Sequence, residues 1–277
     1  LNNEVNIYVI VSSMLNYRVA CINVHHPFKE HLMTQKTKVA LVTGASRGIG
    51  AEIAKRLASE GFYTVVNYAN SAGAADKVVE EIKAAGGQAQ AYQVDVSNAK
   101  QVNRMFADVK ASLGSIDVLI NNAGVMKLNA LSDAKDEDID AQLNVNLKGT
   151  INTLREASVH LSSGGRVINL SSSVIGLKLE RYAVYAATKA AVEVMTGILA
   201  KEMRGKQITV NAVAPGPTET ELFLQDKSEE MVTKLANMSP MERLGQPSDI
   251  ASVVAFLASE QSAWVNGQTI RANGGVV

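Results

Sequence analysis

The stretch Val39-Ala-Leu-Val-Thr-Gly-Ala-Ser-Arg-Gly-Ile-Gly50 decides the fold of this chain. It begins with apolar, β-branched residues typical of a buried strand, and an apolar pattern with helical spacing follows from Ala51. The glycines at positions 44, 48 and 50 let the backbone turn tightly and come close to a phosphate. Because a helix start offers free N–H groups and a positive dipole end, the stretch predicts a strand, a phosphate-binding turn and a helix. A tight turn that binds nothing is the alternative interpretation.

Strands and helices alternate along the rest of the chain. Short apolar runs predict buried strands, and the longer amphipathic patterns between them predict helices. The predicted strands cover 39–43, 63–66, 89–94, 116–120, 166–170, 208–213 and 268–271, and the predicted helices cover 51–60, 74–85, 99–113, 136–160, 184–204 and 247–258. We expect 215–247, which is rich in proline, to be a loop and lid. This alternation predicts the α/β class, with a single doubly wound Rossmann domain whose seven-stranded, mainly parallel sheet carries helices on both faces.

Composition excludes several classes of protein. The 277 residues include 27 Lys and Arg against 27 Asp and Glu, so the chain lacks the excess positive charge that nucleic-acid binding requires. Its single cysteine, Cys21, rules out an internal disulfide framework and a thiolate zinc site, and fits a cytoplasmic location. The most apolar N-terminal run, residues 5–15, is shorter than the ~20 residues of a spanning helix, so no membrane association is expected.

Residues 1–32 differ in composition from the rest of the chain. They contain the only cysteine and three of the four histidines, and they show no regular hydrophobic period. We interpret them as an extraneous or poorly ordered extension that precedes a folded domain at 33–277. His25, His26 and His31 are interpreted as solvated side chains, and no metal site is expected.

Short polar motifs occur at the ends of predicted strands and inside predicted helices. They are Asn121-Asn-Ala-Gly124, Asn144-Val-Asn146, Ser171-Ser-Ser173, Tyr185-Ala-Ala-Thr-Lys189 and Pro215-Gly216. Together with the glycine-rich turn, these motifs resemble those of the short-chain dehydrogenase/reductase family, and the resemblance covers about residues 37–277. It implies an oxidoreductase that transfers hydride between NADP(H) and the carbonyl or alcohol group of a small-molecule substrate.

Tyr185 and Lys189 carry the proton chemistry in this interpretation. They are four residues apart on a predicted helix, so their side chains share one face. A nearby ammonium favours the phenolate and lowers the pKa of a tyrosine. The tyrosine can then give its proton to a carbonyl oxygen as hydride reaches the carbon. An ordinary helix with a surface lysine is the alternative, which the serines upstream argue against.

The catalytic serine is identified by counting. Counting along the strand from Arg166 and counting back thirteen residues from Tyr185 both give Ser172, which would hold the substrate oxygen. The residues that follow the three serines, Val174-Ile-Gly176, favour Ser173 instead and imply a one-residue deletion in the loop. The resemblance implies that Asn146 holds a water that links Lys189 to solvent. Hydrogen bonding inside the helix is the alternative role of Asn146.

The cofactor is predicted to be NADP(H). No acid occurs between Gly61 and Asp76, where an NAD-binding protein places a carboxylate for the ribose hydroxyl, and Arg47 lies in the glycine-rich turn. An exposed loop cation is the alternative interpretation of Arg47. The motifs and the family resemblance imply cofactor contacts from Thr43, Gly44, Ser46, Arg47, Gly48, Ile49, Gly50, Asn67, Asp95, Val96, Asn122, Ala123, Gly124, Tyr185, Lys189, Pro215, Gly216, Thr218 and Thr220.

Substrate and assembly are less constrained by the sequence. The apolar side chains of the lid, such as Leu222 and Phe223, either cover a hydrophobic carbonyl compound or serve helix packing. A 3-oxoacyl-(acyl-carrier-protein) reductase is an alternative. It requires basic residues near the mouth of the site, which Arg204 and Lys206 could supply. A non-catalytic NADP-binding regulatory protein is a more distant alternative, which Ser172, Tyr185, Lys189 and Asn146 argue against. Relatives imply a homo-oligomer, a tetramer or a dimer, joined through the long helices.

Overall fold

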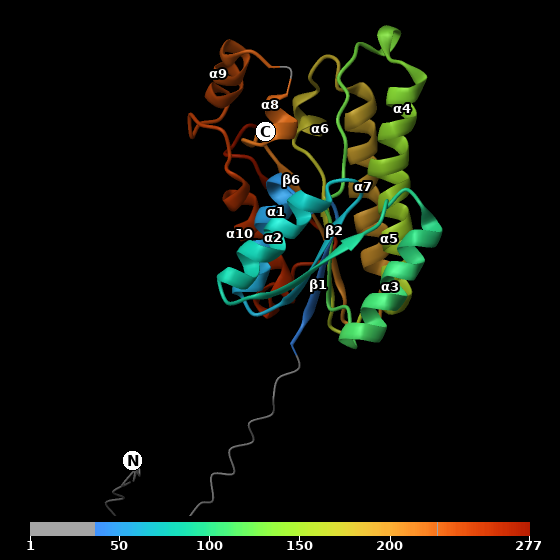
Figure 1. Ribbon diagram of the computed structural model, residues 1–277. Coiled ribbons are helices and arrows are strands. Elements are labelled where there is room, and N and C mark those ends of the chain that lie inside the picture. Colours follow the sequence, from blue (N-terminus) through green and yellow to red (C-terminus); the bar gives the residue numbers. More distant parts are fainter. Residues whose placement is uncertain (1–36, 226) are drawn as a thin grey trace, which may run out of the picture. The chain divides into compact units, whose positions relative to one another are not determined.

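Seven parallel strands form the central sheet in the computed structural model, which describes residues 37–225 and 227–277 (Figure 1). The strands are β1 (Val39–Val42), β2 (Tyr63–Tyr68), β3 (Gln88–Gln93), β4 (Val118–Asn121), β5 (Arg166–Leu170), β6 (Thr209–Pro215) and β7 (Thr269–Ala272). Their order in the sheet is β3-β2-β1-β4-β5-β6-β7, and every neighbouring pair is parallel. The predicted doubly wound Rossmann sheet is therefore confirmed.

Helices cover both faces of the sheet and enclose two apolar cores. Figure 1 shows α1 (Gly48–Ser59), α2 (Ala72–Ala84) and α10 (Pro247–Ala258) on one face, and α3 (Ala99–Leu113), α5 (Gly149–His160) and α7 (Ala183–Glu202) on the other. Each set of helices packs its buried side chains on one side of the strands. Because β1 and β4 are buried on both faces, all of β1 and the first three residues of β4 are apolar rather than alternating.

The order of the strands determines where a ligand can bind. The chain adds β2 and β3 on one side of β1, then returns to add β4 and its successors on the other side. A crevice forms at the carboxyl ends of the strands at such a reversal, and ligands of open α/β sheets bind there. The proposed extension at 1–32 and its three histidines lie outside the described residues.

Two predicted segments differ from the structure. The helix predicted over 136–160 consists of α4 (Asp136–Gln142), a π-helical segment (Leu143–Lys148) and α5. A π turn carries one extra residue and occurs often at functional sites. Within the predicted loop at 215–247 lie two short helices, α8 (Glu221–Leu224) and α9 (Glu229–Asn237). The turn of helix after β5, α6 (Val174–Leu177), and 3₁₀ turns at Leu131–Asp133 and Glu260–Ser262 were too short to predict.

Helix α7 is unusually apolar for its length. Of the described helices, it alone has the length and apolar composition of a membrane-spanning helix. Its buried residues, which include Val192, Thr196 and Leu199, face β5 and β6 in the sandwich, where a core helix lies. Val194 and Ile198 on its outer side are exposed by 63% and 52%. The apolar composition therefore serves two surfaces, one against the sheet and one facing outward.

Candidate active site and nucleotide-binding loop

The glycine-rich turn is fastened to the end of β4 by side chains. The Thr43 hydroxyl accepts hydrogen bonds from the backbone N–H groups of Asn122 and Ala123, at 3.0 and 3.1 Å. The Asn122 amide donates to the carbonyl oxygens of Thr43 and Gly44, at 3.0 and 2.9 Å. Both side chains thus hold the turn against the neighbouring strand, which leaves the helix start of α1 free to face a ligand.

Two glycines in this turn are required by space. Gly44 has a φ of +61°, and a Cβ there would lie 2.7 Å from Cα of Ala123. A Cβ at Gly50 would lie 2.3 Å from Nδ2 of Asn122. Side chains at these two positions would therefore push the turn away from the residues that follow β4. The turn fits the dinucleotide phosphates that the sequence predicts, since it offers backbone N–H groups without side chains over them.

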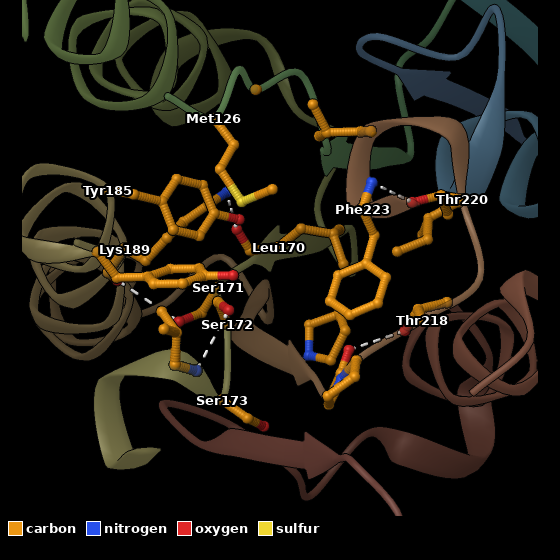
Figure 2. A pocket seen from close by; sticks show the side chains of 18 of the residues that line it. Met126, Leu170, Ser171, Ser172, Ser173, Tyr185, Lys189, Thr218, Thr220 and Phe223 are labelled. Atoms are coloured by element: carbon orange, nitrogen blue, oxygen red, sulfur yellow. Dashed lines mark hydrogen bonds between the residues drawn. The ribbon is translucent and has the colours of Figure 1, made fainter. Parts of the chain in front are cut away.

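A serine, a tyrosine and a lysine come together where β5 meets α7 (Figure 2). The side chains of Ser172 and Tyr185 line the same pocket, and the Ser172 hydroxyl accepts a hydrogen bond from the Val174 N–H at 3.3 Å. The Lys189 ammonium donates to the carbonyl oxygen of Leu170 at 2.8 Å and lies 5.8 Å from the centre of the Tyr185 ring. All three side chains line one pocket, which has a volume of about 150 Å³. The arrangement can donate a proton to an oxygen that enters the pocket.

Burial changes the acidity of the two ionisable groups. It raises the pKa of Tyr185 to about 12, against a smaller opposite effect of the hydrogen bond from Ser172. It lowers the pKa of Lys189 to about 8. The sequence predicted that the ammonium lowers the tyrosine pKa, and this was wrong. The reason is that Lys189 directs its proton at the Leu170 carbonyl rather than at the phenol oxygen.

The two candidate serines have different environments. The Ser173 hydroxyl donates to the carbonyl oxygen of Ala214 and accepts from the Asn273 amide, both at 3.0 Å. Ser173 is 2% exposed, and its hydroxyl is therefore engaged by β6 and the C-terminal segment. The Ser172 hydroxyl faces the pocket beside Tyr185. The geometry thus favours Ser172 over Ser173, as the two counts did.

Asn146 lies in the π-helical segment and is buried at 1% exposure. Its side chain accepts from the Val125 N–H at 2.8 Å, and donates to the Val125 carbonyl oxygen at 2.9 Å and to the Thr188 hydroxyl at 3.3 Å. It thereby links the segment after β4 to the helix of Tyr185 and Lys189. The implied water contact is neither required nor contradicted by these bonds.

The predicted cofactor residues fall into three groups. Those in the main pocket are Ile49, Asn122, Gly124, Tyr185, Lys189, Pro215, Gly216, Thr218 and Thr220. Thr43, Val96 and Ala123 line a smaller hollow beside β4. Gly44, Ser46, Arg47, Gly48, Gly50, Asn67 and Asp95 lie outside both linings. The cofactor contacts of all three groups stay predictions.

Two residues near the expected ribose site have partners within the chain. The Asn67 amide is buried and donates to the carbonyl oxygens of Val94 and Tyr92, at 3.0 and 3.2 Å. These bonds join β2 to β3 and the residue that follows it, and the cofactor contact of Asn67 stays a prediction. Arg47 is exposed and pairs loosely with Glu221 of α8, at 3.5 Å. It can therefore turn toward an anion at little cost.

The pocket has an apolar wall that sequence reasoning identified only in part. Leu222, Phe223 and Leu235 come from the expected lid, while Met126, Leu177, Leu179 and Tyr182 were not singled out. Figure 2 shows Met126 beside Tyr185 and Phe223 on the opposite side of the pocket. Tyr182 packs edge-on against Tyr185, with 6.4 Å between ring centres. The one available signal was an aromatic residue three positions before Tyr185.

Arg204 and Lys206 do not flank this pocket. They follow the C-terminal end of α7. The Lys206 carbonyl oxygen accepts from the N–H of Gly164, before β5 begins. Strand starts and strand ends are on opposite edges of a parallel sheet, so the suggestion that these cations supply charge at the mouth was wrong.

Among residues 37–225 and 227–277, no three His, Cys, Asp or Glu side chains cluster as metal ligands would.

Comparisons with known proteins identify the family. A family model described as "Enoyl-(Acyl carrier protein) reductase" matches residues 44–277. A short-chain type dehydrogenase/reductase of Picea abies is 44% identical over 250 residues, which cover 87% of this chain and 92% of that protein. The 3-oxoacyl-(acyl-carrier-protein) reductase FabG of Staphylococcus aureus is 44% identical over 245 residues, which cover 87% of this chain and 98% of that protein.

A solved structure agrees with these relatives. A short-chain dehydrogenase from Burkholderia cenocepacia J2315, in complex with NADP, is 37% identical with a TM-score of 0.82, covering 86% of this chain and 97% of that one. Agreement of sequence, fold and polar motifs argues against the non-catalytic alternative. The chain belongs to the short-chain dehydrogenase/reductase family and is an oxidoreductase that transfers hydride between a nicotinamide cofactor and a carbonyl or alcohol group.

Proposed function

We propose that this enzyme uses NADPH to reduce an uncharged, apolar ketone or aldehyde. The observation that carries the proposal is that Ser172 and Tyr185 line one pocket together with apolar side chains such as Met126 and Phe223. NADPH supplies the hydride when it is bound. The roles assigned below to individual side chains are part of the proposal.

Ser172 and Tyr185 act on the carbonyl oxygen of the substrate. Both side chains line the pocket, and in this proposal their hydroxyls hold the oxygen and stabilise charge that develops on it. Because burial raises the pKa of Tyr185 to about 12, the phenol keeps its proton at neutral pH and can donate it to that oxygen. Lys189 and Asn146 lie behind Tyr185, where they position the helix and return a proton from solvent.

The lining of the pocket supports an uncharged substrate. Its ionisable side chains are Lys189, Tyr185 and Tyr182, so it contains no Arg or His to pair with a carboxylate or phosphate and no acid to pair with an amine. The Lys189 ammonium is already bonded to the Leu170 carbonyl oxygen. A buried charge without a partner costs several kcal/mol, so ionised substrates would bind poorly in the pocket itself.

A 3-oxoacyl group on a carrier protein is the second candidate substrate. The segment 177–182 lines the mouth with Leu177, Leu179 and Tyr182, while Lys178 and Arg181 between them are exposed. Both cations have positive φ values, 51° and 71°, a strained conformation that persists where tertiary structure demands it. Exposed cations beside the mouth favour an acidic carrier, and a relative with that activity supports this candidate.

A substrate panel separates the two candidates. We expect turnover of uncharged ketones with NADPH, and Lys178→Glu with Arg181→Glu should leave it unchanged. If the carrier-bound substrate is the physiological one, the same double variant would raise its KM several-fold and spare the free ketones. No turnover of any carbonyl compound, despite tight NADPH binding, would contradict the proposed function.

The proposed NADP(H) preference rests on charge. No carboxylate follows β2 to repel a 2′-phosphate, and the exposed Arg47 guanidinium lies in the turn before α1. The related Burkholderia enzyme was solved with NADP. A single cysteine and this cofactor also favour the proposed cytoplasmic location.

We also propose a homo-oligomer, a dimer or a tetramer. Large apolar side chains are exposed on two neighbouring helices: Ile151 and Val159 on α5, and Val194 and Ile198 on α7. Exposed large apolar side chains on both helices favour an interface there. Replacing Val194 and Ile198 by Lys should convert the assembly to monomers in sedimentation velocity. A wild-type protein that sediments as a monomer at micromolar concentration would refute this.

Tyr185→Phe should lower kcat for ketone reduction by about 10² or more, because the ring stays while the proton donor is lost. NADPH affinity, measured by fluorescence titration, should remain within a few-fold. Ser172→Ala should lower kcat far more than Ser173→Ala, which serves as the neighbouring control. More than half of the wild-type activity in Tyr185→Phe at neutral pH would show that the proton has another source.

NADPH should be used at least tenfold more efficiently than NADH, which is about 1.4 kcal/mol. Arg47→Ala should reduce this ratio through a higher KM for NADPH and leave the KM for NADH unchanged. Arg56→Ala on the same helix, where the guanidinium pairs with Glu60, is the matched control. Equal use of both cofactors by the unmodified enzyme would contradict the argument.

The rate of reduction should fall as pH rises through about 8. In this range Lys189, whose pKa burial lowers to about 8, loses its proton, while Tyr185 stays protonated. The lowered pKa means that the folded enzyme loses this charge at a lower pH than a free lysine would. Initial rates from pH 6 to 10 test this, with the exposed Lys201→Met on the same helix as control. A flat profile up to pH 9.5 would exclude Lys189 from the proton path.

A further inference from the structure

Three consecutive residues at the end of β5 are each bonded to α7. The Asn169 amide donates to the Thr196 hydroxyl at 2.9 Å, and the Leu170 carbonyl oxygen accepts from Lys189 at 2.8 Å. The Ser171 hydroxyl donates to the carboxylate of Glu193 at 2.7 Å, and the next residue, Ser172, lines the pocket with Tyr185. The helical partners 189, 193 and 196 lie with Tyr185 on one stripe of α7, since these positions are spaced by about one turn.

The contact between Ser171 and Glu193 is the unexplained member of this series. Ser171 is 4% exposed, so its hydroxyl needs a partner inside the protein. Its other acceptor, the Lys189 carbonyl oxygen, is at 3.5 Å, the outer limit of a hydrogen bond. Glu193 is half-buried on a helix that is otherwise strongly apolar. Partial burial of a carboxylate costs free energy that its bond to Ser171 offsets.

We propose that Glu193 is a positioning residue for the reaction: its carboxylate holds the end of β5 against α7 and so determines the distance between Ser172 and Tyr185. Ser171 is the residue next to Ser172, and Glu193 lies one turn beyond Lys189 and two turns beyond Tyr185. The bond therefore links the segment that carries Ser172 to the helix that carries Tyr185. At 2.7 Å it is the shortest of the bonds between the end of β5 and α7 described above. This inference rests on the proposed roles of Ser172 and Tyr185.

A displaced strand end would affect the reaction more than binding. Misplacement of a reacting group by about 1 Å can cost 10² in rate, whereas the glycine-rich turn and Arg47, which are expected to hold the NADPH phosphates, lie between β1 and α1 and not in this contact. Loss of Glu193 should therefore lower kcat and leave cofactor affinity intact. Loss of a merely structural carboxylate would lower the melting temperature and leave both kcat and the NADPH affinity unchanged.

The experiment compares three changes at the contact. Glu193→Leu removes the acceptor, Ser171→Ala removes the donor, and Glu193→Gln keeps an acceptor oxygen without charge. We expect at least a tenfold lower kcat for Glu193→Leu and for Ser171→Ala, with NADPH dissociation constants within twofold of wild type. The double variant should be no slower than the worse single one, because both remove the same bond. Glu193→Gln should keep more than half of kcat and an unchanged pH profile.

Two controls separate positioning from stability. Glu202→Leu changes an exposed acid at the end of the same helix and should have no effect. Asn211→Ala removes a buried amide of β6 that donates to the Val265 carbonyl oxygen at 2.7 Å, and should lower the melting temperature without changing kcat. Sedimentation of each variant checks that assembly is unchanged, since a kcat loss that follows dissociation would overturn the proposal.

The results also distinguish this inference from the proposed function. If Tyr185→Phe is inactive and Glu193→Leu keeps kcat within twofold of wild type, the positioning role is refuted and the function stands. If Glu193→Gln is as slow as Glu193→Leu, the charge rather than the bond matters and the proposal fails. If Tyr185→Phe keeps its activity, the proposed function fails first, whatever the Glu193 variants do.

Discussion

Strands that all run in one direction must end at one edge of the sheet. Every neighbouring pair in this sheet is parallel, so the ends of β1, β4, β5 and β6 bring the glycine-rich turn, Asn122, the serine run and Pro215 to the same edge. Segments distant in sequence thus meet without a long loop, and the reversal between β1 and β4 opens a crevice among them. The location of the site therefore follows from strand direction and does not depend on the side chains.

Hydrogen bonds from buried polar side chains then hold this edge together. Thr43 and Asn122 fasten the turn to β4, Asn146 joins β4 to α7, and Ser173 joins β5 to β6. Each bond uses a group that would be costly to bury alone, so the bonded arrangement is favoured strongly over its alternatives. Burial also has a cost for a charged group: it lowers the pKa of Lys189 to about 8, so the ammonium loses its proton more easily.

Local sequence patterns predicted most of the fold and part of the site. Alternating buried runs and amphipathic helices predicted the sheet, and the four-residue spacing of Tyr185 and Lys189 predicted their common face. The π turn at Asn146 was not predictable, because it depends on bonds to Val125, a residue that only the fold brings near. The direction of the Lys189 ammonium, and with it the pKa of Tyr185, likewise depends on a carbonyl oxygen of another element. Met126 and Tyr182 became wall residues through tertiary packing, for which the sequence offers no spacing rule.

The apolar wall of the pocket has a consequence for how such an enzyme can change. Met126, Phe223 and Leu177 come from three separate segments outside the sheet, and their contribution is shape rather than hydrogen-bond geometry. Replacing one of them alters the volume offered to a substrate without removing the bonds of Ser171 and Lys189 that hold the end of β5 against α7. Substrate range can therefore drift through evolution, or be redesigned, by exchanging side chains on this wall one at a time, while the reaction itself is inherited unchanged.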